Sequence, residues 1–291
     1  MPDKRLVDFL TLETIEDDIF RGESRNIGTP QVYGGQVLGQ SLAAAQATVE
    51  GRDVHSVHAY FLRRGDFEAP IIYQVERTRD GRSFASRRVS AIQHGKPIFT
   101  MSASFQAPEE GLEYYEKVEQ FPEYPEASTN SIEKIIRESD PDQVKLEDPK
   151  FRKNQLGFYI AKAKQHIDPN SGETSNASNR WWFRTFEEIG DDKLMQKSIV
   201  AYISDAGLIG TAAKPHGYNM NDRRSAHKLF MMTSLDHAMW FHRPFRVDEW
   251  LLYESTAVST GNGRGLVRGN IYSRDGTLVV SCIQEGVFRK K

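Results

Sequence analysis

The pattern of apolar and polar positions divides the chain into two similar halves. In the first half, apolar residues at helical spacing over 36–49 come before four segments in which apolar and polar residues alternate. These predicted strands cover residues 55–64, 71–79, 83–93 and 98–106. Asp80-Gly81 and His94-Gly95 stand where tight hairpin turns would join neighbouring strands. One helix followed by an antiparallel meander predicts an α+β unit.

The second half repeats this order. A helix is predicted over 194–213, and the strands that follow it are predicted over 229–243, 250–259, 266–274 and 278–289. Asn262-Gly263 and Asp275-Gly276 supply the turns. The whole chain is therefore predicted to hold two α+β units in tandem.

The residues themselves also repeat. Residues 56–73 read SVHAYFLRRGDFEAPIIY and residues 234–254 read SLDHAMWFHRPFRVDEWLLYE, so each copy runs from Ser through His-Ala, an aromatic pair and an Arg into an apolar run. The offset between matching positions stays at 181 or 182, since Gly81 matches Gly263, Arg87 matches Arg268 and Gly95 matches Gly276. A steady offset over this length indicates an internal duplication.

Two regions depart from the repeated pattern. Residues 3–20 carry apolar residues at the spacing of a short amphipathic helix. Residues 107–180 form an acidic, proline-punctuated segment, predicted to be a linker with one or two helices and a mobile last part at 171–179. The predicted division is an N-terminal unit at 1–110, a linker or insert at 111–180 and a C-terminal unit at 181–291.

Composition excludes several classes of partner. The formal net charge of -2 gives no electrostatic reason to expect nucleic acid or an anionic membrane as the main partner. No apolar run approaches the ~20 residues of a membrane span, and the first residues lack the apolar core of a signal peptide. Cys282 is the only cysteine, so no disulfide can form within the chain. We expect a cytoplasmic protein.

Asp205 is the first candidate for chemistry, because it is the only charged residue within 199–213, a segment that reads IVAYISDAGLIGTAA. An ionised carboxylate in such surroundings must be paired, be hydrogen-bonded or have a raised pKa. A carboxylate in that condition is a candidate general base. The competing interpretation is that Asp205 caps a helix that begins at Ala206.

Ser234 and Gln284 are the next candidates. Ser234 precedes Asp236 and His237, but the Gly-x-Ser-x-Gly elbow of a serine hydrolase does not occur in the sequence. In one continuous strand Ser234 and Asp236 would share a face and His237 would point to the other, so His237 is interpreted as a packed residue and Ser234 as a donor to bound water. Gln284 can both donate and accept, although a solvent-facing position in its strand is the simpler interpretation. One Cys and eight His without helical ligand spacing give little support for a metal.

Taken together, these residues resemble the motifs of the type II acyl-CoA thioesterases. The matching stretches are YGGQVLGQSL (33–42), VHSVHAYFLRRG (54–65), GRSFASRRV (81–89), KPIF (96–99), YISD (202–205), SLDHAMWFHRPF (234–245) and CIQEG (282–286). Members of this family carry two hotdog units in one polypeptide. The resemblance therefore implies two tandem hotdogs, each a long helix wrapped by a curved antiparallel sheet.

The resemblance also implies an activity. The family hydrolyses fatty acyl-CoA to free fatty acid and CoA, as part of lipid metabolism, with no cofactor and no metal. Its catalytic trio falls on Asp205, Ser234 and Gln284, with Asp205 as general base for direct attack of water. His58 matches a motif histidine, to which we assign packing or a place near the substrate. The candidates to bind the CoA phosphates are Arg63, Arg64, Arg243 and Arg268.

Two other functions are weighed against this one. A hotdog enoyl-CoA hydratase or dehydratase would need a His paired with Asp or Glu at the helix, and Asp205 has no His within helical reach. A non-catalytic acyl-CoA-binding module would have no reason to keep all three members of the trio. Since the broad sheets leave open edges, a homo-oligomer is expected. At an offset of 181 Gln284 matches Ala103, so one active site per chain is expected.

Overall fold

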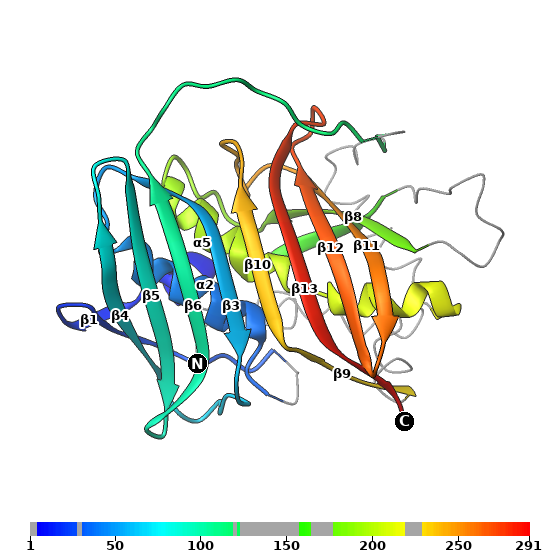
Figure 1. The fold of residues 1–291 in the computed structure, drawn as a ribbon, viewed down its shortest axis with the longest axis horizontal. Helices are drawn as coiled ribbons and strands as arrows, with labels where there is room; N and C mark the ends of the chain where they lie inside the picture. The colour runs from blue at the N-terminus through cyan, green and yellow to red at the C-terminus, as the bar shows by residue number, and fades with distance from the viewer. Residues whose placement is uncertain (1–4, 28–30, 119–120, 123–156, 164–176, 219–228) are drawn as a thin grey trace.

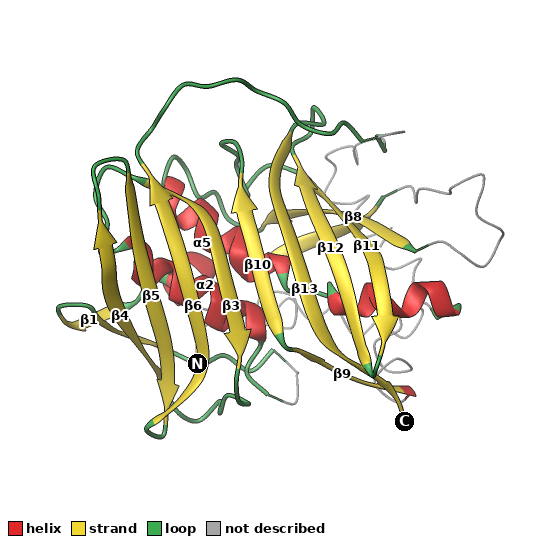
Figure 2. Ribbon diagram, in the orientation of Figure 1, coloured by secondary structure: helices red, strands yellow, loops and turns green. Residues whose placement is uncertain are grey.

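The computed structural model describes residues 5–27, 31–118, 121–122, 157–163, 177–218 and 229–291. Within these ranges thirteen strands form one large antiparallel sheet, and the helices lie on one of its faces (Figures 1 and 2). The α+β class predicted from the sequence is thus confirmed. No helix in the described ranges is both long enough and apolar enough to cross a bilayer.

The first half of the chain contributes one side of the sheet. Its elements are α1 (Leu6–Leu10), β1 (Glu13–Glu16), β2 (Ile19–Gly22), α2 (Gly34–Gln46), β3 (Asp53–Phe61), β4 (Ile71–Asp80), β5 (Phe84–Gln93) and β6 (Lys96–Gln106). The strands lie side by side in the order β1-β2-β4-β5-β6-β3.

The second half contributes the other side. Its elements are β7 (Phe158–Lys162), β8 (Ser178–Thr185), α5 (Lys193–Ser204), the 3-10 helix η2 (Ile209–His216), β9 (Phe230–Ser234), β10 (Asp236–Phe241), β11 (Leu251–Gly261), β12 (Arg264–Tyr272) and β13 (Leu278–Lys290). The strand order is β10-β13-β12-β11-β8-β7, and β9 pairs with β13 beyond the end of β10.

The two halves meet at β3 and β10, which pair antiparallel in the middle of the sheet (Figure 1). His58 lies directly opposite Ala238, its own match in the second half at an offset of 180. This pair is the centre of the seam, and the pairs on either side of it, Tyr60 with Asp236 and Ser56 with Trp240, are related by exchange of the two copies. The seam thus joins the copies symmetrically, as an interface between two identical subunits would.

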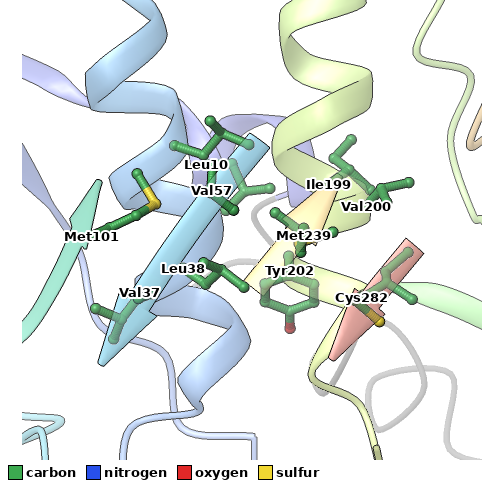
Figure 3. Close-up of a cluster of buried hydrophobic side chains, with 14 of the residues drawn as sticks. Leu10, Val37, Leu38, Val57, Met101, Ile199, Val200, Tyr202, Met239 and Cys282 are labelled. Carbon is green, nitrogen blue, oxygen red and sulfur yellow. The ribbon is translucent and has the colours of Figure 1, made fainter. Parts of the chain in front are cut away.

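Helices α2 and α5 pack against each other behind this seam (Figure 2). Glycines allow the close approach: a Cβ atom on Gly39 would lie 2.8 Å from the backbone oxygen of Ser198, and one on Gly35 would overlap the backbone oxygen of Tyr202. Leu38 of α2, Val57 of β3 and other side chains from both halves close the core between the helices and the sheet (Figure 3). These glycines of α2 therefore serve the close packing of the two helices.

Strand pairing corrects two of the matches between the copies. Within each half, Arg87 pairs with Ala103 and Val267 pairs with Gln284. If Gln284 matches Ala103, the residue of the second half that corresponds to Arg87 is therefore Val267, and not Arg268. A shift of one residue turns a strand side chain to the other face, which agrees with the burial: Arg87 is 2% exposed, whereas Arg268 is exposed. At the offset of 180 Ser56 matches Asp236, and not Ser234 as their shared residue type had suggested.

Two predicted helices are shorter than expected. In the described part of residues 3–20 only Leu6–Leu10 is helical, and the rest forms the β1–β2 hairpin. Asp18, with φ of 62°, makes the turn, and a local apolar count cannot reveal that β2 pairs with distant β4. The predicted helix 194–213 is divided into α5 and η2 at Gly207, whose φ of 74° is a left-handed conformation that ends a helix.

The predicted linker is only partly described. Residues 107–118 contain no helix or strand, while β7 lies inside the predicted insert and pairs with β8. Most of 111–180, including the greater part of the stretch predicted to be mobile, lies outside the described residues.

Candidate active site

Asp205 stands at the C-terminal end of α5, and its side chain reaches across to the other half of the chain. Its Oδ2 accepts a hydrogen bond of 3.0 Å from the backbone N–H of Gly35, in the first turn of α2. The capping interpretation is therefore wrong in its details, because α5 ends at Ser204 and η2 begins only at Ile209. The carboxylate instead lies at the N-terminal end of α2, where the helix dipole favours negative charge.

The other two members of the predicted trio lie beside it. Gln284 Nε2 donates to Asp205 Oδ1 at 2.6 Å, and Ser234 Oγ donates to the same oxygen at 3.3 Å. The three side chains come from β13, from the end of β9 and from the end of α5. Residues up to 79 positions apart are thus brought into one hydrogen-bonded cluster.

Burial gives this carboxylate unusual acid–base behaviour. Asp205 keeps a small opening to solvent, yet loss of water around it raises its pKa to about 6 from 3.8. The hydrogen bonds from Gln284, Gly35 and Ser234 act in the opposite direction, because each stabilises the charged form. The result is a carboxylate that is ionised at neutral pH and that still binds a proton more readily than an ordinary aspartate does.

A break in the strand explains how Ser234 reaches this cluster. The predicted strand 229–243 is in fact two strands, because Leu235 separates β9 from β10. The Leu235 N–H donates to the Glu285 carbonyl, and the Leu235 carbonyl accepts from the Phe61 N–H, both at 2.9 Å. The break interrupts the strand alternation, so Ser234 bonds to Asp205 while His237, expected on the opposite face, bonds to Gln284.

Gln284 is completely buried on the inner face of β13, so the solvent-facing interpretation is wrong. Its Nε2 lies within hydrogen-bonding distance of both Asp205 and His237. Its Oε1 is buried and has no hydrogen-bond partner among the described residues. An unpaired buried acceptor is costly, which indicates a place for a donor such as a water molecule.

The start of α2 completes the site, a role that the sequence did not assign to it. A Cβ atom on Gly34 would lie 2.8 Å from both Asp205 Oδ2 and the Phe61 ring, so only glycine leaves room there. Tyr33 donates from its hydroxyl to the backbone oxygen of Tyr202 at 2.8 Å. The pair of glycines in YGGQ was the available signal, because two glycines at a helix start mark a close approach of the backbone.

The remaining predicted site residues are spread over the sheet. His58 is exposed on the outer face of β3, where its ring meets Trp240 edge-on at 5.4 Å, while Val57 and Ala59 point inward. Arg268 is exposed on the outer face of β12. Neither residue is brought to Asp205.

Arg63 and Arg64 differ from Arg243 in which end of the sheet they occupy. Arg63 and Arg64 are exposed just after Phe61, at the same end as Asp205. Arg243 follows β10, which runs antiparallel to β3, and so lies at the opposite end. There its guanidinium packs 4.6 Å from the ring of Tyr115. In the described ranges no group of three or more His, Cys, Asp or Glu side chains could hold a metal ion.

Comparison with known proteins gives consistent matches over the chain. Residues 21–106 match the family model of the acyl-CoA thioesterase N-terminal domain, and residues 136–288 match that of the C-terminal domain. Acyl-CoA thioesterase 2 of Haemophilus influenzae is 38% identical, over 98% of this chain and 96% of that protein. Acyl-coenzyme A thioesterase 8 of Homo sapiens is 38% identical, over 97% of this chain and 88% of that protein.

Solved structures give the same result for the fold. An acyl-CoA thioesterase II from Mycobacterium marinum, TesB2, matches with a TM-score of 0.76 and 34% identity, over 97% of both chains. A protein of unknown function with a hot dog fold from Alicyclobacillus acidocaldarius matches with a TM-score of 0.68 and 14% identity, over 97% of both chains. The large antiparallel sheet and its packed helices are thus of the hotdog type.

Proposed function

Since the chain belongs to the type II acyl-CoA thioesterase family and is an acyl-CoA thioester hydrolase, we propose that it hydrolyses fatty acyl-CoA by direct attack of water, with Asp205 as general base. The unpaired Oε1 of Gln284 beside the Asp205 carboxylate is the observation that carries this proposal. A water molecule there would donate one hydrogen to each of these acceptors. Both lone pairs of the water oxygen would remain free, and one of them would attack the substrate.

The proposed reaction needs no covalent intermediate with the protein. The water oxygen bonds to the thioester carbonyl carbon while its proton passes to Asp205. The carbonyl oxygen becomes an oxyanion, which the positive end of α2 stabilises. When the oxyanion re-forms the carbonyl, the C–S bond breaks and the CoA sulfur takes the proton back from Asp205. The products are a free fatty acid and CoA.

The groups around Asp205 keep their charge over the range in which Asp205 titrates. The pKa of Cys282 is raised by burial to about 12, and burial also raises the pKa values of Tyr202 and Tyr253. Burial lowers the pKa of His237 to about 3, so this side chain stays neutral. Over the range from pH 5 to pH 8, Asp205 is the group in this cluster that changes charge.

We further propose that the chain is a tandem double hotdog with units at 1–110 and 181–291 and an insert at 111–180, from which β7 adds an edge strand to the second unit. The symmetrical β3–β10 seam supports this division of the chain.

We also propose that the protein is a cytoplasmic homo-oligomer that acts in lipid metabolism. Arg63 and Arg64 are the arginines proposed to meet the CoA phosphates, because they lie at the Asp205 end of the sheet.

One active site per chain is proposed, built on second-half residues. In the first half Ala103 matches Gln284, and Arg87 lies opposite Ala103. The Arg87 guanidinium is buried and makes five hydrogen bonds, to Thr48 Oγ1 and Asp80 Oδ1 and to the backbone oxygens of Thr48, Arg79 and Ser86. The position opposite the match of Gln284 is therefore occupied by a side chain whose guanidinium is held by five hydrogen bonds.

The alternative function, an enoyl-CoA hydratase or dehydratase, is not supported by His237, the histidine of the site. His237 is buried and bonded to Gln284 and Ser204, and its lowered pKa suits neither a proton donor nor a base near neutral pH. Release of free thiol from palmitoyl-CoA separates the candidate functions. We expect steady thiol release from the wild type and almost none from Asp205→Asn, with acyl-CoA binding retained. Tight binding without thiol release at any acyl length would favour a binding module instead.

A further inference from the structure

His237 is the buried polar residue of this cluster that the mechanism above does not use. It is completely buried on the inner face of β10. Its Nδ1 lies 3.1 Å from Gln284 Nε2, and its Nε2 lies 3.0 Å from Ser204 Oγ. Both ring nitrogens are thus engaged, one of them with the amide proposed to hold the water.

Neighbouring groups fix which nitrogen carries the proton. Ser204 has a single hydroxyl proton, and its Oγ lies 2.8 Å from the backbone oxygen of Ala201, which can only accept. The hydroxyl therefore donates to Ala201 and accepts from His237, so the imidazole proton sits on Nε2. Nδ1 is left as an acceptor, because His237 is neutral with its pKa lowered to about 3.

This tautomer determines how the Gln284 amide is oriented. The amide NH₂ has two hydrogens, and one is held by Asp205 Oδ1 at 2.6 Å. With Nδ1 as an acceptor, the second hydrogen is held by His237, and Oε1 is the atom left for water. A proton on Nδ1 would favour the reversed amide, which would place Oε1 against the Asp205 carboxylate and turn NH₂ toward the water.

We propose that His237 is a positioning residue, which acts through its neutral Nε2–H tautomer to hold the Gln284 amide with NH₂ toward Asp205 and Oε1 toward the attacking water. The inference rests on the proposed role of Gln284. It also gives each hydrogen bond a direction. Gln284 donates both to Asp205 and to His237, His237 donates to Ser204, and Ser204 donates to the Ala201 carbonyl in the last turn of α5.

A pair of variants separates this role from simple packing. Asn in place of His237 can set its Oδ1 where Nδ1 was, so His237→Asn should keep the acceptor and most of kcat. His237→Gln sets its amide near the former Nε2 and should lose the acceptor. We expect its kcat to fall by about tenfold to a hundredfold with KM unchanged, as for a misplaced catalytic group. Thermal unfolding of both variants controls for loss of the fold.

The pH profile gives a readout that packing alone would not move. The hydrogen bond from Gln284 lowers the pKa of Asp205, so its loss in His237→Gln should shift the acidic limb of kcat/KM to higher pH. His237→Asn should keep the wild-type limb. Equal kcat and equal acidic limbs in wild type and His237→Gln would overturn the proposal, as would equal losses in both variants.

The tautomer can also be measured without activity. Nitrogen-15 NMR of the wild type, with the His237 signals assigned by their absence in His237→Asn, should show protonated Nε2 and bare Nδ1 from pH 5 to pH 8. A proton on Nδ1 would overturn the inference whatever the mechanism. Full turnover in Asp205→Asn would instead remove the proposed base, and the NMR result would still stand or fall by itself.

Discussion

Replacement of Asp205 by Asn tests the environment of the carboxylate through stability as well as activity. The pKa of Asp205 is about 6 in the folded protein, against 3.8 for an ordinary aspartate side chain. A folded-state pKa above the unfolded one means that the folded state binds the proton more tightly. Stability from this group is therefore fully present below pH 3.8 and is lost as the pH rises through 6.

The size of the effect follows from the shift. A difference of about 2.2 pKa units corresponds to at most about 3 kcal/mol, of which about 2 kcal/mol is lost between pH 4.5 and pH 7.5. The value of about 3 kcal/mol is an upper bound, because the carboxylate keeps a small opening to solvent. Other carboxylates titrate in the same range, so the useful quantity is the difference between wild type and Asp205→Asn, in which they cancel.

The assay is urea unfolding at pH 4.5 and pH 7.5, followed by the fluorescence of the four tryptophans. Relative to the wild type, Asp205→Asn should gain about 2 kcal/mol between the two pH values. In the same pH series wild-type kcat/KM should fall on acidification with a single apparent pKa near 6. Turnover of the variant should be lower by orders of magnitude. Parallel stability curves together with an acidic limb near pH 4 would refute the raised pKa.

Three further outcomes are expected. Gln284→Ala should remove nearly all activity and Ser56→Ala should leave most of it, with one productive site per chain in titrations with a slow acyl-CoA analogue; if each variant kept half, two sites would be at work. Gly34→Ala should reduce kcat strongly, because its Cβ would lie 2.8 Å from Asp205 Oδ2, whereas Gly111→Ala, with nothing within 4 Å, should be silent; similar kcat values would contradict the crowding. Light scattering at micromolar concentration should give a mass above that of one chain, and a monomeric mass would count against the oligomer.

Regular strands were predictable from the sequence because both of their signals are local. Alternation and hairpin glycines placed β4, β5 and β12 within about two residues of their observed bounds. The helical prediction over 3–20 was right only for Leu6–Leu10, because pairing with a distant strand decides the rest of the segment. Local patterns carry no information about such a partner.

The site shows the same division. The lone charge in an apolar segment was enough to single out Asp205, and the family motifs added Ser234 and Gln284. The hydrogen bond from the Gly35 N–H to Asp205 could not be inferred from the sequence, since it depends on how α2 packs against α5. The orientation of His237 was missed because the break at Leu235 interrupts the alternation on which the prediction relied.

The hydrogen bond between Gly35 and Asp205 joins two halves of one chain across 170 positions. If the halves were separate subunits, this contact would form by a second-order encounter, and dilution would take the base away from its helix. Covalent linkage makes the encounter first-order, so that it no longer depends on the concentration of the protein. The catalytic group therefore stays assembled at any protein concentration at which the chain is folded.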